Sequence, residues 1–269
     1  MDSLQKYIEE KRDAWLEELS EFLRIPSIST IPDYQPQVRR GAEFALQGLQ
    51  RVGIERAELI ETSGHPLVYA ERLGVESAPT VLCYGHYDVQ PPDPLNEWTS
   101  PPFEPAVRNG NIYARGAADD KGQVMIQWKA VEALRATTGG LPLNLKFILE
   151  GEEETGGGSI EAYVKNSGEK LKADVALVYD TALFAPDLPT LCIGLRGLVY
   201  VELEAEGASH DLHSGLYGGV APNPLNARAW ILGALKAPDG KIRIPGIYDR
   251  VRPPSRSERA SWRRLPFDA

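Results

Sequence analysis

The sequence of 269 residues predicts an α/β fold in which helices lie on the faces of a sheet. Three observations lead to this prediction. Short β-prone apolar runs alternate with longer runs whose apolar residues recur at helical spacing. Glycines follow several of these runs and mark where they end. Hydrophobic residues make up 42% of the chain and charged residues 25%, which is ordinary for a globular protein of this length.

The first elements are predicted to be two helices and two strands. Apolar residues at helical spacing predict an amphipathic helix over residues 4–23, which ends before Pro26. A second helix is expected over residues 37–52, because Gly53 follows it. Residues 56–61 and 67–71 are expected to be short extended segments.

From residue 81 onward, predicted strands and helices alternate. The strands are expected over residues 81–84, 143–149 and 175–179, the last of them buried. The helices are expected over residues 121–134, closed by Gly139 and Gly140, and over residues 160–165. This order indicates a sheet with helices on its faces.

The pattern changes near residues 194–197. Residues 198–206 alternate apolar and charged side chains, as a half-exposed strand does. A turn-rich loop and a helix over residues 223–235 follow, and Ser255 and Glu258 have the spacing of a capping box. We therefore expect one domain over residues 1–195 and the beginning of a second, incomplete domain over residues 196–269.

Composition excludes several classes of function. A net charge of −9 argues against nucleic-acid binding, and no apolar run approaches the roughly 18 residues of a membrane-spanning helix. The first residues show no secretory signal, so we expect a cytoplasmic protein. Cys83 and Cys192 lie in apolar runs, where we expect buried free thiols rather than a disulfide.

Histidine and acidic residues adjoin several predicted elements, where open α/β sheets place their ligand sites. His86 and Asp88 follow a strand, and alternation along an extended chain points both side chains the same way. Imidazole is a good zinc ligand, and a nearby aspartate can orient it. Taken alone, the pair is more typical of a polar loop than of a metal site.

Carboxylates gather at three further positions. Asp119 and Asp120 begin a helix, where helix capping explains them as well as metal bridging does. The glutamates at residues 152–154 follow a strand, and the alternatives are a solvated charge run or a metal ligand beside a base. Asp180 ends a strand, where a turn residue is the simpler interpretation. Glycines 156–158 do not form a phosphate loop, because no Gly-Lys-Ser/Thr follows them.

Together these clusters resemble a known family. Residues 85–89 (Gly-His-Tyr-Asp-Val), 116–122 (Gly-Ala-Ala-Asp-Asp-Lys-Gly) and 151–156 (Gly-Glu-Glu-Glu-Thr-Gly) occur in the order seen in metallopeptidase family 20. That family contains cytosolic dipeptidases, carnosinase, bacterial glutamate carboxypeptidase, aminoacylase and succinyl-diaminopimelate desuccinylase. Residues 194–197 and 211–219 are similar to its dipeptidase branch. The resemblance implies a zinc-exopeptidase-like α/β sandwich followed by an inserted α+β lid and dimerisation domain.

The resemblance also implies which residues would bind metal. His86 and Asp180 would hold one zinc ion, Glu154 would hold a second, and Asp119 would bridge the two. Mn²⁺ or Co²⁺ could replace zinc. The peptide bond between Asp119 and Asp120 is expected to be cis, as in the family.

The other motif residues would act on the substrate, a dipeptide or short peptide. Glu153 would be the general base for a metal-activated water, with Asp88 orienting His86. His213 would stabilise the oxyanion across a homodimer formed through the lid domain, with a polar turn as the alternative interpretation. His210 is expected at the surface and His65 in a loop.

This chain departs from the family pattern after the lid begins. Family members are longer and return to the catalytic domain to supply a last histidine ligand, whereas no histidine follows His213 here. We therefore expect one competent metal site, one incomplete site, and an exposed sheet edge that favours self-association. Three functions stay open: dipeptide hydrolysis, deacylation of N-acyl amino acids at the same site, and a truncated, inactive metal-binding fragment.

Overall fold

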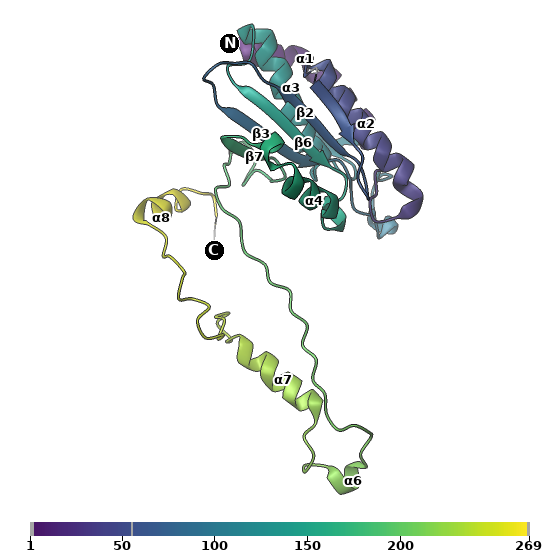
Figure 1. Ribbon diagram of the computed structural model, residues 1–269, viewed down its shortest axis with the longest axis vertical. Coiled ribbons are helices and arrows are strands. Elements are labelled where there is room, and N and C mark those ends of the chain that lie inside the picture. Colours follow the sequence, from purple (N-terminus) through teal and green to yellow (C-terminus); the bar gives the residue numbers. More distant parts are fainter. Residues whose placement is uncertain (1–2, 55, 268–269) are drawn as a thin grey trace. The chain divides into compact units, whose positions relative to one another are not determined.

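The computed structural model describes residues 3–54 and 56–267, and the chain divides into two units, Met1–Phe184 and Ala185–Ala269 (Figure 1). Residues 1–2, 55 and 268–269, which belong to the predicted domains 1–195 and 196–269, lie outside the described residues. The predicted domain boundary stays a prediction.

The first unit is built around a five-stranded mixed sheet in the order β1-β2-β6-β3-β7. The strands are β1 (Arg56–Ile60), β2 (Leu67–Arg72), β3 (Thr80–His86), β6 (Asn144–Glu150) and β7 (Val175–Val178). β3 runs parallel to both β6 and β7, whereas β2 runs antiparallel to β1 and β6. The carboxyl ends of β3, β6 and β7 therefore meet at one edge of the sheet.

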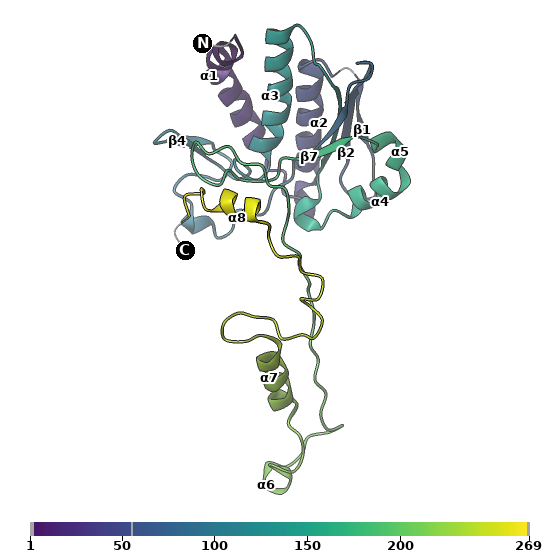
Figure 2. The ribbon, with the colours of Figure 1, turned by 90° about the vertical axis from the view of Figure 1, so that its left-hand side faces the viewer.

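Helices cover both faces of this sheet, which confirms the predicted α/β class. α1 (Ser3–Leu23), α2 (Gln35–Arg51) and α3 (Lys121–Thr138) lie on one side, and α4 (Gly158–Asn166) and α5 (Gly168–Leu171) lie on the other (Figure 2). Gly139 ends α3 in the left-handed conformation, with φ 74°, as its place in the sequence predicts. Short 3-10 turns span η1 (Pro32–Tyr34), η2 (Leu95–Glu97) and η3 (Glu153–Thr155).

Two apolar clusters hold the layers together. The larger one joins α1, α2 and α3 to the sheet, with Trp128 fully buried and Phe22 stacked on Phe44 at 4.7 Å between ring centroids. The smaller one packs Ile160 and Tyr163 of α4 against the opposite face. The sheet is thus buried on both faces near its centre, and every residue of β6 after Asn144 is buried.

Two details of the first unit differ from the predictions. The strand at residues 175–179 is not buried, because β7 is the last strand of the sheet, and Val175 and Val178 are about half exposed. The hairpin of β4 (Ala106–Arg108) and β5 (Asn111–Tyr113) has no counterpart in the predictions. Strands of three residues are too short for hydrophobic alternation to reveal.

The second unit contains α6 (Ser214–Tyr217), α7 (Pro224–Leu235) and α8 (Arg256–Trp262), joined by irregular segments. Asn223 caps α7, and Ser255 and Glu258 form both bonds of the predicted capping box on α8. The predicted strand over residues 198–206 is wrong, because these residues form no ladder in the structure. A strand needs a neighbour, and the described part of the second unit offers it none.

The two cysteines also differ from each other. Cys83 is buried in the core of the first unit as predicted, and burial raises the pKa of its thiol to about 12. Cys192 is exposed, so the prediction that its apolar run is buried is wrong. The run lies in an irregular segment of the second unit, where Leu191 and Ile193 are also exposed.

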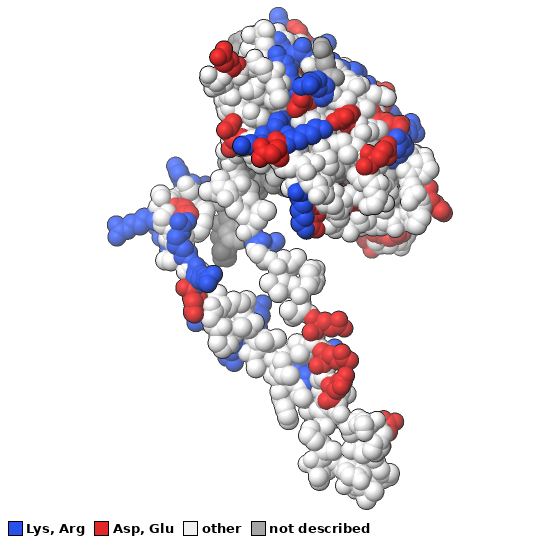
Figure 3. Space-filling view, in the orientation of Figure 1, with Lys and Arg blue, Asp and Glu red and all other residues white. Residues whose placement is uncertain are grey.

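The surface carries both signs of charge. On the face in Figure 3, basic and acidic side chains are interspersed over the first unit, without the continuous basic stripe that phosphate backbones require. Within the described ranges, none of the helices combines the length and apolar character needed to cross a bilayer.

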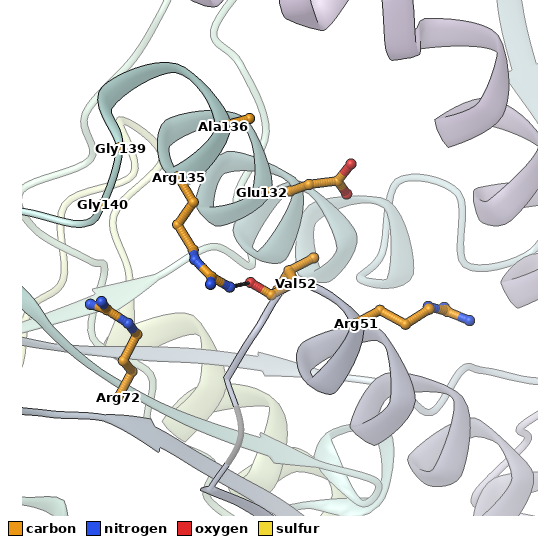
Figure 4. Close-up of a pocket in the computed structure, with 8 residues that line it drawn as sticks. All are labelled: Arg51, Val52, Arg72, Glu132, Arg135, Ala136, Gly139 and Gly140. Carbon is orange, nitrogen blue, oxygen red and sulfur yellow. Dashed lines mark hydrogen bonds between the residues drawn. The ribbon is translucent and has the colours of Figure 1, made fainter.

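A hollow lies where the carboxyl ends of α2 and α3 approach each other (Figure 4). Its lining includes Arg51, Arg72 and Arg135, and the Arg135 guanidinium donates to the carbonyl of Val52. Its single carboxylate, Glu132, already accepts hydrogen bonds from Tyr7, Trp15 and Lys129. The hollow therefore lacks free acid–base groups for chemistry.

Leu49 provides a test of the larger core. Replacing this fully buried α2 side chain by alanine removes apolar contacts and leaves a cavity, so we expect Leu49→Ala to lower the free energy of unfolding by about 2–5 kcal/mol. Leu73→Ala, at a position 46% exposed, should change it by less than about 0.5 kcal/mol. Urea unfolding of both variants measures the difference, and equal losses would contradict this description of the core.

Candidate metal centre

The parallel strands bring the predicted site residues to one edge of the sheet. His86 ends β3, Asp88 follows it, Asp180 follows β7, and the glutamates of η3 follow β6. Asp119 lies just before α3, joined to Asp120 by the predicted cis peptide bond. Segments up to about a hundred residues apart in the chain therefore meet at the ends of three neighbouring strands.

His86, Asp119 and Asp180 form a compact group of possible ligands. Their ligand atoms all lie within 4.8 Å of one another. His86 Nε2 lies 3.0 Å from Asp119 Oδ1 and 3.8 Å from Asp180 Oδ2. Among the described residues, this is the one group of three or more such side chains close enough to share a cation.

Asp88 determines which imidazole nitrogen faces this group. His86 Nδ1 lies 3.1 Å from the backbone carbonyl of Asp88 and 3.3 Å from its Oδ1. A carbonyl oxygen can only accept, so Nδ1 carries a proton and Nε2 is directed at Asp119 and Asp180. Both His86 and Asp88 are fully buried, which holds the ring in this orientation.

Asp88 also connects to the glutamate turn. Its Oδ2 accepts from Ser29 Oγ at 2.6 Å and from the backbone N–H of Glu154 at 3.2 Å. The Glu154 carboxylate itself accepts from Gln90 Nε2 at 2.8 Å. Glu154 is close enough to Asp119, His86 and Asp88 for their charges to act on it, but it is not a member of the compact group.

Gly85 and Asp120 fasten α3 to the end of β3. Asp120 occupies the N-cap position of α3 without capping it, and its Oδ2 instead accepts from the backbone N–H of His86 at 3.0 Å. The capping interpretation of this Asp pair is therefore not supported. A Cβ at Gly85 would lie 2.5 Å from Val124 and 2.8 Å from Asp120 Oδ2, so only glycine permits this close approach.

The carboxyl groups of the site are partly or fully buried and lie close together. Burial raises the pKa of Glu153, and the charges of Glu154, Asp180 and Asp88 add to this effect while His86 opposes it. Burial likewise raises the pKa of Asp120 to about 7. For His86, burial lowers the pKa, but hydrogen bonds to Asp119 and Asp88 outweigh it and raise the pKa to about 11. Several acids thus share a space in which a cation would offset their repulsion.

Sequence reasoning passed over other residues of the site. Glu150, the last residue of β6, is buried, accepts from Tyr84 at 2.7 Å and has a pKa raised by burial to about 7. Ser29 and Gln90 lie outside the recognised motifs, and only their contacts with Asp88 and Glu154 reveal them. Glu150 alone had a visible signal, since it directly precedes the 151–156 motif.

The other histidines lie elsewhere. His213 belongs to the second unit, where its Nδ1 accepts from the backbone N–H of Gly215 at 3.0 Å and caps α6. Its predicted role at the oxyanion stays a prediction. His210 is exposed, and His65 lies in a loop with Nε2 at 3.3 Å from the carbonyl of Ser29, as expected for both.

A model of the peptidase family M20/M25/M40 matches residues 82–243, which is more than half of the chain and includes every residue of the site from His86 to Asp180. The chain belongs to this family. The resemblance inferred from the motifs is confirmed. The match also confirms the predicted class of sandwich fold, since related solved structures superimpose on nearly the whole chain.

The chain is also similar to individual proteins whose names give an activity. The "Cys-Gly metallodipeptidase dug1" of Schizosaccharomyces pombe is 35% identical over 93% of this chain and 55% of its own length. The human "Beta-Ala-His dipeptidase" is 31% identical over 100% of this chain and 56% of its own length. A solved M20 family metallo-carboxypeptidase from Sulfolobus solfataricus is 37% identical, with a TM-score of 0.76, over 94% of this chain and 57% of its own. The chain thus spans a little over half the length of these relatives.

The close approach at Gly85 generates a test. Gly85→Ala should lower the free energy of unfolding by about 1–3 kcal/mol, because its methyl group would overlap Val124 and the Asp120 carboxyl. Gly140→Ala is the matched control, since a Cβ there meets nothing within 4 Å. Urea unfolding compares the two, and a Gly85→Ala variant as stable as Gly140→Ala would contradict the described packing of α3 on β3.

Proposed function

We propose that this chain is the metal-binding catalytic part of a dipeptidase that hydrolyses the amide bond of dipeptides or short peptides. The observation that carries the proposal is the compact group of His86, Asp119 and Asp180 at the carboxyl ends of the parallel strands. The dipeptidase names of the relatives support the reaction class.

The donor set fits a divalent metal. It combines one imidazole nitrogen with carboxylate oxygens, which suits zinc and also Mn²⁺ or Co²⁺. Asp120 Oδ1 and Glu150 Oε2 are buried, and the described residues offer neither of them a hydrogen-bond partner, so the site holds unsatisfied carboxyl oxygens. Zinc is the ion we propose, held by His86, Asp119 and Asp180.

A second ion is proposed beside Glu154, with Asp119 shared between the two. Asp119 supports this role because its carboxylate is exposed and lies beside His86, while its charge also acts on Glu154. Metal ions in such a site polarise the scissile carbonyl and lower the pKa of bound water.

Within the proposal, Glu153 is the general base that accepts a proton from the attacking water. Its pKa is raised by burial and by Glu154, Asp180 and Asp88, which favours a group that accepts a proton and later gives it to the leaving amine. Asp88 keeps the His86 ring in the tautomer that presents Nε2 to the metal. Burial of His86, Asp88 and Asp120 limits water at the back of the site.

Dipeptides are preferred over N-acyl amino acids as the proposed substrates. Both carry an amide that the same groups can hydrolyse, so the site chemistry alone does not separate them. The names of the relatives, Cys-Gly and Beta-Ala-His dipeptidases, favour a dipeptide with a free amino group.

The remaining proposals concern the protein's location in the cell and its assembly into a dimer. We place it in the cytoplasm, supported by its acidic balance and its two free cysteines. We propose that the whole protein forms a homodimer through the region that begins at residue 196, with His213 completing the partner's site. Exposed apolar side chains in this region, such as Tyr200 and Trp230, support an interface there.

Removal of one carboxylate tests the metal site. We expect the chain to bind one zinc ion tightly. Asp180→Asn should weaken that binding by more than about 100-fold, because removal of even a residue that only orients a ligand typically lowers metal affinity 10–100-fold. Asp13→Asn, on the exposed side of α1, is the control and should bind zinc like the wild type. Competition with a chelator of known affinity measures both, and equal affinities would refute the assignment of Asp180.

Replacement of Glu153 tests the reaction. Glu153→Gln should keep its bound zinc yet lose about 10²–10⁴-fold in hydrolysis of Cys-Gly or β-Ala-His, because the amide cannot take up the proton. Glu169→Gln, whose side chain is 94% exposed, should hydrolyse like the wild type. Rates with an N-acetyl amino acid are measured in parallel. Faster release of acetate than of amino acids from dipeptides would favour the deacylase, and no turnover by zinc-loaded wild type would favour an inactive fragment.

A further inference from the structure

The loop at residues 62–66 contacts the site from outside the recognised motifs. Thr62 closes the loop on itself, because its Oγ1 donates to the carbonyl of His65 at 2.7 Å and accepts from the N–H of Gly64 at 3.1 Å. Two contacts then lead outward from His65. Its backbone N–H donates to Glu152 Oε1 at 3.3 Å, and its Nε2 lies 3.3 Å from the carbonyl of Ser29.

Glu152 fastens this loop to the glutamate turn. While Oε1 faces the loop, Oε2 accepts from the N–H of Ser159 at 3.0 Å, in the first turn of α4. The Glu152 backbone carbonyl also accepts from Thr155 and Gly157, so the η3 turn is held from both sides. A Cβ on Gly64 would lie only 1.7 Å from Oε1, which shows how closely the loop approaches the carboxylate.

Ser29 completes the connection on the other side. Its carbonyl faces the His65 ring, and its hydroxyl donates to Asp88 Oδ2 at 2.6 Å. The same oxygen accepts from the N–H of Glu154 at 3.2 Å. The contacts therefore form a closed ring that runs from His65 through Ser29, Asp88 and the η3 turn to Glu152, and back to His65.

We propose that Glu152 and Ser29 are positioning residues of the metal centre, which act through this ring to fix Asp88 and the Glu153–Glu154 turn relative to His86. The inference rests on the proposed metal site. Glu152 reaches neither His86 nor Asp119 in the described contacts, so its effect passes through the turn that carries Glu154 and through the His65 loop. Ser29 acts through Asp88, whose fully buried carboxylate it anchors.

The physical reason is the precision that metal ligation requires. Partners that orient a ligand are typically worth 10–100-fold in metal affinity, because a ligand that must be ordered on binding loses free energy. A carboxylate can hold two segments together, because each of its two oxygens accepts a hydrogen bond from a different segment. An amide has only one acceptor oxygen and cannot do this. In Glu152→Gln the –NH₂ group must therefore face either the N–H of His65 or that of Ser159, and one bridge is lost.

The test measures zinc and cobalt binding to the full chain, not activity. Glu152→Gln is expected to weaken zinc binding about 10- to 100-fold and to alter the visible absorption of bound Co²⁺, which reports ligand geometry. Glu161→Gln is the matched control. Glu161 also lies close to the η3 turn in sequence, in α4, but among the described residues its carboxylate forms an ion pair with Lys165 alone, at the surface. Far-UV circular dichroism and thermal unfolding without metal establish that each variant is folded.

A second pair of variants tests Ser29. Ser29→Ala should weaken zinc binding by a similar factor, whereas Ser29→Thr keeps the hydroxyl and should restore the affinity of the wild type. If Glu152→Gln does not fold, this pair decides the question, and equal affinities of Ser29→Ala and Ser29→Thr overturn the inference.

The outcomes separate this inference from the proposed function. Wild type that does not bind zinc or cobalt refutes the proposed metal site itself. Wild type that binds zinc, together with a Glu152→Gln variant that matches Glu161→Gln in affinity and in the Co²⁺ spectrum, refutes the positioning role while leaving the metal site in place.

Discussion

The parallel pairing of β3 with β6 and β7 is the constraint on which the site depends. Its register sets His86 opposite Glu150, and it ends three strands at one edge, so that the loops carrying Asp88, Glu154 and Asp180 emerge side by side. A shift of one residue would turn every side chain of β3 to the other face of the sheet and remove His86 from this edge. The two-sided burial of the central strands, between α1–α3 and α4–α5, is what holds the register.

The ionisable groups at this edge affect one another strongly because they are buried. His86, Asp88 and Asp120 are fully buried, and each is kept in one orientation by hydrogen bonds. His86 donates to the carbonyl of Asp88, whereas the carboxylates of Asp88 and Asp120 accept from Ser29 and from the N–H of His86. Burial, with the crowding of acids added to it, raises the pKa of Glu153 and Glu154, and some buried oxygens have no hydrogen-bond partner among the described residues. A divalent cation bound at His86, Asp119 and Asp180 would offset the repulsion between these acids, in line with the proposed function.

The two units differ in how well the local sequence pattern predicts their helices and strands. The helices and strands of the first unit are close to those predicted, because their apolar faces meet a sheet or helix that buries them. In the second unit, Ser255 caps α8 as predicted, and Asn223 caps α7, since a cap is satisfied within a few residues of itself. The strand expected over residues 198–206 fails, because its ladder would need a partner strand that the described residues do not supply.

The sequence by itself determined the α/β class, the positions of the main helices and central strands, the family, and the motif residues from His86 to Asp180. Local periodicity, caps and spaced motifs carry that information within short segments. Tertiary structure alone decided that Asp120 binds the backbone of His86 instead of capping α3, and that β7 is the exposed edge strand. It also decided that Ser29 binds Asp88 and that Glu152 binds the backbone of His65. These features depend on contacts between residues far apart in the chain, and spacing along one segment carries no record of what packs against it.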